Sequence, residues 1–166
     1  MRALPFAIAS ALTLACLSTS LAGQRPVAPI DARSQALLQQ GRAERAAGNL
    51  GAATDTLETA AAVDPRNREA FILLAQVAEA RGLPGKAIRL YREALVLEPN
   101  DVAALRGQGE ALVMKGALAQ AQVNLAKIRA LCKGACPDAN QLAAVIAKGP
   151  PVTTAQADTA VKPKAE

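Results

Sequence analysis

Apolar and small residues recur along this chain at helical spacing, in pairs of short segments separated by glycine or proline. The clearest pair covers about residues 67–80 and 84–97, on either side of Gly82-Leu83-Pro84. Glycine can take the left-handed turn that ends a helix, and proline is well placed in the first turn of a helix. No segment alternates β-branched and aromatic residues as strands do, so the pattern predicts an all-α fold. The same signals predict a first helix that begins near Asp31 to Ser34, and others at about 50–63, 101–115, 117–131 and 137–147.

The helical pairs repeat with a period of 34 residues. Small residues recur where two helices would cross closely, and larger apolar residues recur where a core must be filled. A period in this range indicates a helical repeat, in which each unit completes its core only against its neighbours. The positions in register are Gly48, Gly82 and Gly116; Ala53, Ala87 and Ala121; Leu57, Tyr91 and Leu125; Leu37, Phe71 and Leu105; and Gly41, Ala75 and Gly109.

These residues resemble the tetratricopeptide repeat family, whose pattern is a large apolar residue, Leu-Gly/Ala, alanine, an aromatic, alanine and a closing proline. The first repeat departs from the pattern at Gln40 and Glu44, and the third at Ile128 and Lys133. The resemblance implies a short right-handed α-solenoid of three helix-turn-helix repeats with a C-terminal capping helix. The middle repeat matches best, with Phe71, Leu74, Ala75, Gly82, Ala87, Tyr91, Ala94 and Pro99.

Residues 1–22 are typical of a secretory leader, with Arg2, an apolar run and small residues at Ser20 and Ala22. The apolar run is too short to span a bilayer as a lasting anchor. A lipoprotein leader processed at Cys16 is the alternative, and only that alternative would attach the protein to a membrane. We therefore expect a bacterial-type protein that is periplasmic or secreted after cleavage near Ala22.

The remaining chain divides by its composition. A linker with two prolines comes first, then the repeat domain, and then a tail without periodicity that we expect to be disordered. The expected bounds are 23–33 for the linker, 34–148 for the domain, with repeats at about 34–67, 68–101 and 102–135 and a capping helix at 137–147, and 149–166 for the tail.

The composition argues against several functions. The formal net charge is +5, but basic residues alternate with acidic ones and there are only three aromatics, which makes nucleic-acid binding a poor interpretation. Histidine is absent, and Ser34 is the only serine beyond the leader, so histidine-dependent nucleophiles and metal sites are excluded. We expect no catalysis, cofactor, metal or small-molecule substrate. Glu69 and Glu79 are a possible pair of catalytic carboxylates, but their spacing is explained by a polar helix face.

In the resembled family, the first helix of each repeat lines a concave groove that holds a partner protein. The resemblance therefore implies a peptide or a helix as partner, and a scaffold or adaptor in the cell envelope as function. By helical spacing, the exposed groove residues are Gln35, Leu38, Arg42 and Arg45 in the first repeat, Glu69, Ile72, Gln76 and Glu79 in the second, and Arg106, Glu110, Val113 and Met114 in the third.

Some members of the family hold the terminal carboxylate of a chaperone tail with lysine and asparagine side chains. The corresponding positions here are Leu38, Arg42, Leu73, Ala103 and Gly107. Only Arg42 has suitable chemistry, so this binding mode is not expected. Tyr91, by its place in the repeat, is a core aromatic rather than a catalytic phenol.

Cys132 and Cys136 are the two thiols that remain if the leader is removed. In an exported protein, a structural disulfide between the third repeat and the capping helix is the simplest interpretation. A thiol-redox or disulfide-handling role is the alternative function. The spacing is wider than that of thioredoxin-like motifs, and two cysteines are too few ligands for zinc.

Overall fold

The structure, a computed structural model, describes residues 28–151. The leader, Cys16, the first part of the linker and residues 152–166 lie outside the described residues. Within 28–151 the chain forms seven helices and no strand: α1 (Ala32–Ala46), α2 (Leu50–Val63), α3 (Arg68–Ala80), α4 (Pro84–Leu97), α5 (Val102–Met114), α6 (Leu118–Leu131) and α7 (Pro137–Lys148). Their bounds agree with the predicted helices to within one or two residues.

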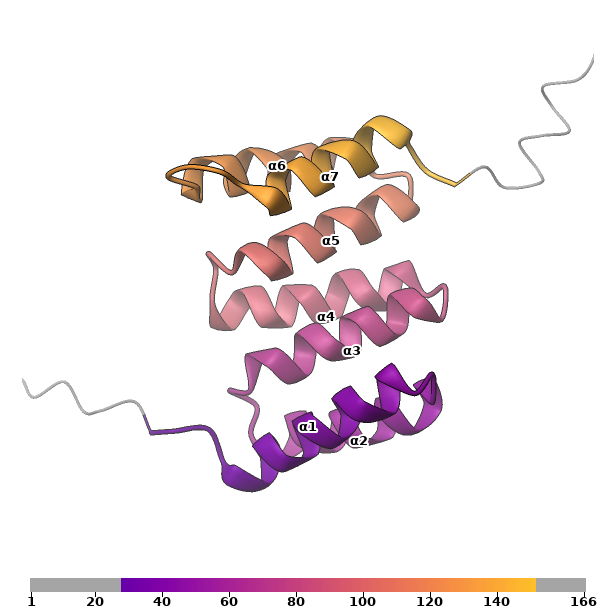
Figure 1. The fold of residues 1–166 in the computed structure, drawn as a ribbon, viewed down its shortest axis with the longest axis vertical. Coiled ribbons are helices and arrows are strands. Elements are labelled where there is room, and N and C mark those ends of the chain that lie inside the picture. The colour runs from indigo at the N-terminus through magenta and orange to yellow at the C-terminus, as the bar shows by residue number, and fades with distance from the viewer. Residues whose placement is uncertain (1–27, 152–166) are drawn as a thin grey trace, which may run out of the picture.

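The helices form two layers of a curved stack (Figure 1). Helices α1, α3, α5 and α7 form one layer, which we call the inner layer, and α2, α4 and α6 form the outer layer behind it. Successive helices pack on one another, and α7 packs on both α5 and α6. The expected all-α solenoid is therefore confirmed. No helix among residues 28–151 has the length and apolar character needed to cross a bilayer.

Local chemistry explains where the inner helices begin and end. The side chains of Asp31, Asn67 and Asp101 accept hydrogen bonds from first-turn N–H groups of α1, α3 and α5. Each of these helices is followed by a glycine with positive φ, which is 69° at Gly82. The N–H of Gly82 donates to the carbonyl of Glu79, and that of Leu83 to the carbonyl of Ala78. These two bonds form the Schellman motif, which satisfies carbonyls that the helix end leaves unpaired.

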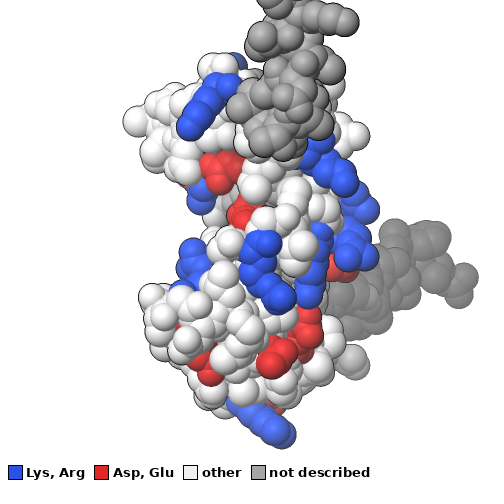
Figure 2. All heavy atoms as spheres, turned by 90° about the vertical axis from the view of Figure 1, so that its right-hand side faces the viewer, with Lys and Arg blue, Asp and Glu red and all other residues white. Residues whose placement is uncertain are grey.

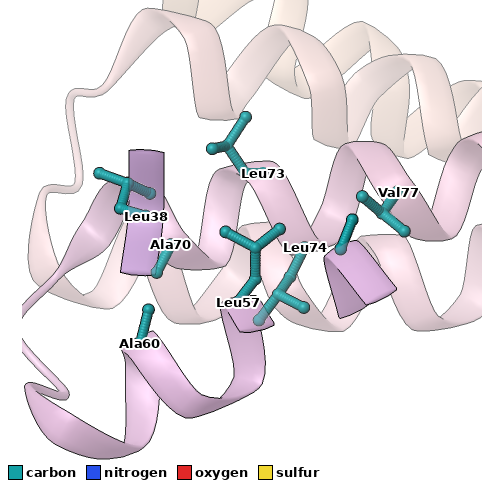
Figure 3. Close-up of a cluster of buried hydrophobic side chains, with 8 residues drawn as sticks. Leu38, Leu57, Ala60, Ala70, Leu73, Leu74 and Val77 are labelled. Carbon is teal, nitrogen blue, oxygen red and sulfur yellow. The ribbon is translucent and has the colours of Figure 1, made fainter. Parts of the chain in front are cut away.

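The core consists of apolar clusters that pass from one repeat to the next. Figure 3 shows the first, in which side chains of α1, α2 and α3 converge, among them Leu38, Leu57 and Leu74. The predicted column of small residues lies at close helix contacts: a Cβ on Gly41 would lie 2.5 Å from Cγ of Leu57. Phe71 was expected in the core, but it is only partly buried at the edge of the second cluster.

Helix α7 closes the apolar face of the last repeat. Leu142 is fully buried, and with Ala139 it packs against Leu105, Leu125 and Ile128. A Cβ on Gly109 of α5 would lie 2.6 Å from Cδ2 of Leu142, so α7 approaches α5 where a glycine leaves room. This position makes α7 a cap for the stack, because a terminal repeat otherwise exposes apolar surface.

Polar side chains hold the start of the first repeat. The buried Ser34 hydroxyl donates to the carbonyl of Ala60 at 2.8 Å and accepts from Nδ2 of Asn67 at 2.8 Å. Asp64 accepts from the Arg66 side chain at 2.8 Å and from the N–H of Asp31 at 2.9 Å. The Arg66 hydrogen bond and then the backbone N–H donors lower the pKa of Asp64 to about 2. These contacts join α1 to the turn between α2 and α3.

Candidate functional site

The inner layer forms the concave side of the stack. In Figure 2, which looks at the ends where α3 turns into α4 and α5 into α6, the outline is hollowed on the side of the inner layer. Acidic and basic side chains both reach this hollow. We call this surface the groove.

The structure exposes most of the residues that were predicted to line the groove. Gln35, Arg42 and Met114 are exposed. Six others are partly exposed, and all are polar: Arg45, Glu69, Gln76, Glu79, Arg106 and Glu110.

The prediction of exposure was wrong for the three aliphatic residues Leu38, Ile72 and Val113, which are 3%, 3% and 1% exposed. Leu38 belongs to the first core cluster, Ile72 to the second, and Val113 to a cluster with Leu112 and Ala121. Each inner helix packs against its own pair and against the next repeat. Its buried stripe is therefore wider than the single face that spacing suggests.

Ion pairs connect neighbouring inner helices across the groove. Arg42 Nη2 lies 3.1 Å from Glu69 Oε1, which links α1 to α3. Arg106 Nε lies 2.8 Å from Asp138 Oδ1, and its Nη1 lies 3.0 Å from Glu110 Oε1. The groove therefore presents a mixed charged surface whose side chains are already held in place.

Helix α7 contributes to this surface, which sequence reasoning missed. Asp138 pairs with Arg106, and Nε2 of Gln141 donates to Glu110 Oε1 at 2.8 Å. The capping role of α7 does not by itself predict these contacts. The signal that could have found the two residues is their spacing of three residues, which places two polar side chains on one face of the helix.

A second connection reaches the groove from the outer layer. Tyr91 of α4 is 1% exposed, and its hydroxyl donates to Glu79 Oε2 at 2.9 Å. Gly107 of α5 leaves room for the phenol, since a Cβ there would lie 2.3 Å from Cζ of Tyr91. The core aromatic thus extends between α3 and α5 to a carboxyl of the groove.

Glu79 has an altered ionisation. Burial is the main reason that its pKa is raised to about 7, and the charge of Glu110 adds to the effect. The Tyr91 hydrogen bond and the charges of Arg106 and Arg45 act in the opposite direction. Its Oε1 is buried and has no hydrogen-bond partner among residues 28–151. Burial also raises the pKa of Tyr91, so the phenol stays a donor.

Glu69 pairs with Arg42 and Glu79 with Tyr91, so the two carboxyls considered as a pair have different partners. Residues 28–151 contain no group of three His, Cys, Asp or Glu side chains placed to hold a metal ion.

Cys132 and Cys136 lie on the turn between α6 and α7, where their sulfur atoms are at bonding distance and their Cα atoms are 6.0 Å apart. Both side chains are partly buried against the cluster that contains Ile128 and Leu142. The geometry is that of a link between the last repeat and the cap.

Comparison with family models gives a match to the one described as "Tetratricopeptide repeat". It matches twice, at residues 38–101 and 72–130, which together cover more than half of the chain. The comparison with curated proteins finds no match.

Solved structures show the same fold. The first TPR of Spaghetti (RPAP3) bound to an HSP90 peptide has a TM-score of 0.64 at 17% identity, covering 70% of this chain and 92% of its own. The Yersinia enterocolitica type III secretion chaperone SycD, in complex with a peptide of the translocator YopD, has a TM-score of 0.61 at 20% identity, with 69% and 86% covered. A tetratricopeptide repeat protein from Parabacteroides merdae has a TM-score of 0.64 at 21% identity, with 75% and 47% covered.

Proposed function

Because this chain belongs to the tetratricopeptide repeat family, we propose that it is a non-catalytic interaction module that holds a peptide or helix of another protein in its groove. The observation that carries the proposal is the groove itself, with exposed Arg42 and Met114 and a network of charged side chains between them. Two similar structures that contain peptides of other proteins support it. A partner with both charged and apolar residues suits such a surface.

The binding mode differs from recognition of a chaperone carboxylate. Of the positions that would hold the carboxylate, Leu38 and Leu73 are buried and apolar, Ala103 has only a methyl group, and Gly107 has no side chain. Arg42 alone remains, and it is already paired with Glu69. The partner is therefore recognised along the groove rather than by its terminal carboxylate.

The proposal is tested by crosslinking in cells and mass spectrometry on the tagged protein and on the variant Arg42→Glu with Arg45→Glu. Reversing two groove charges should reduce capture of a specific partner at least about tenfold, because it places like charges where the partner has complementary ones. The matched control is Arg92→Glu with Arg129→Glu on α4 and α6, where both residues are exposed. Equal capture by the groove variant and the control would contradict the proposal.

We also propose that the protein works in the bacterial cell envelope after export, as the leader at residues 1–22 suggests. In that compartment, Cys132 and Cys136 would form a disulfide that secures α7. Replacing both by serine should lower the free energy of unfolding by about 1 to 2 kcal/mol, since the closed loop is short. Thiol titration of the exported, denatured protein checks the link, and two titratable thiols would contradict it.

A further inference from the structure

A cavity of about 540 Å³ lies between the C-terminal ends of α5 and α7, and we call it the α5–α7 pocket. Val113 and Met114 line it from α5, and Val145 lines it from α7. Lys148 and the segment Gly149–Pro151 form the rest of its wall. The lining is mostly apolar, and Met114 is 38% exposed. The pocket is large enough for a bulky apolar side chain.

One cation lines the pocket, and two more lie on the same edge of the stack. Lys148 is its one charged lining residue. Lys115 directly follows Met114, but its Nζ reaches α4, where it would lie 3.9 Å from a Cβ on Gly85. Arg81 ends α3 and donates to Thr54 Oγ1 of α2. All three are exposed, and none of them forms an ion pair within residues 28–151. Lysine and arginine side chains gather on this edge in Figure 2.

The nearest carboxylates along α5 and α7 do not offset this charge. Glu110 lies one turn before Met114 and is held by Arg106 and Gln141. Asp138 lies at the far end of α7, where it pairs with Arg106. The helix dipole stabilises cations near the C-terminus of a helix, which explains why lysines are favourable there. Because no carboxylate among the described residues neutralises them, their charge can still attract a binding partner.

We propose that the α5–α7 pocket takes an apolar anchor residue of the partner segment, and that an acidic residue beside this anchor pairs with Lys148. The inference rests on the proposed function, because it assigns the chemistry of the segment that the groove would hold. An anchor residue that fills a desolvated pocket is the kind of interface residue that contributes most to affinity, and complementary charges beside it select the partner. The partner segment enters the groove at the end where Met114 lies.

Met114 provides a specific probe, since it is the only methionine besides Met1. The experiment records the ¹³C-methyl signal of Met114 during titration with three short synthetic peptides. The first has a central Phe flanked by Glu residues, the second has the same Phe flanked by Lys residues, and the third has Ala in place of Phe between Glu residues. Backbone amide signals of Gln76 and Glu79 are followed in the same titration to report on the middle of the groove.

The Glu-flanked Phe peptide should shift the Met114 signal in a saturable way. Affinity should fall at least about tenfold for the Ala peptide, for the Lys-flanked peptide and for the variant Lys148→Glu. Arg33→Glu is the matched control and should leave the affinity unchanged. Arg33 is exposed in the first turn of α1, on the opposite side of the stack from the pocket.

Other outcomes would overturn the inference in distinguishable ways. Shifts at Gln76 and Glu79 without a shift at Met114 would mean that the groove binds while the pocket does not, and the proposed function would stand. Equal affinities for the Glu-flanked and Lys-flanked peptides would contradict the proposed preference for acidic residues. Binding that occurs only when the chain is cut after Pro151 would assign the pocket to residues 152–166 of this chain.

Discussion

A Gly107→Ala variant is expected to lose about 2 to 3 kcal/mol of unfolding free energy, the upper part of the range for overpacking a core. The added methyl carbon would lie 2.3 Å from Cζ and 2.4 Å from the hydroxyl oxygen of Tyr91. The phenol cannot move aside easily, because Tyr91 is 1% exposed and its hydroxyl is bonded to Glu79. Urea unfolding followed by far-UV circular dichroism measures the effect.

Two comparisons isolate the cause. Gly85→Ala, in the first turn of α4, places its methyl no closer than 3.9 Å to another group, so it should be neutral or slightly stabilising. Combining Gly107→Ala with Tyr91→Leu should cost less than the two single changes together, since the smaller side chain vacates the space. Additive losses would show that the contact between Gly107 and Tyr91 is not the reason.

The second large effect is a pH dependence that originates at Glu79. Its pKa is about 7 in the folded protein against an ordinary value of 4.5, so the folded state keeps a proton that the unfolded state releases in this range. Stability should therefore fall as pH rises from about 4.5 to 7 and stay lower above it. Glu79→Gln removes the titration while keeping an acceptor for Tyr91. It should raise the unfolding free energy by about 2 kcal/mol above pH 7, allowing for partial screening by water, and by little below pH 4.5.

Unfolding free energies of the wild type and Glu79→Gln across this pH range check the prediction. Glu69→Gln is the matched control, because it makes the same chemical change on α3 at a side chain that is 40% exposed and pairs with Arg42. Parallel wild-type and Glu79→Gln profiles would mean that Glu79 ionises near its ordinary pKa. The lowered pKa of Asp64 acts in a separate window, because its contribution is lost only as pH falls from 3.8 to about 2.

The helices themselves could be predicted from the sequence because the signals that start and stop them are local. Pro84 opens α4, Gly82 closes α3 with a positive φ, and Asp101 caps α5, each within a few residues of the boundary it sets. The 34-residue period then predicted which helices are neighbours, since each repeat completes its core only against the next one. Fold class and repeat architecture follow from these two kinds of information.

The candidate site was predicted only in outline. Helical spacing placed Arg42, Glu69 and Met114 on the groove correctly as exposed or partly exposed residues. It also placed Leu38 and Ile72 there, and the structure buries both. Helical spacing predicts the direction in which a side chain points from its helix axis. Whether the side chain is exposed or buried depends on the distance to the next helix.

By itself, the sequence determined the number of repeats, the helix boundaries and the charged character of the inner faces, because each depends on residues close together in the chain. Only the tertiary structure decided that Tyr91 reaches Glu79 past Gly107, and that Asp138 and Gln141 of α7 join Arg106 and Glu110. It also decided where the α5–α7 pocket opens. These features depend on how closely the helices approach one another, and that distance is set by small residues on one helix and large ones on another, far apart in sequence.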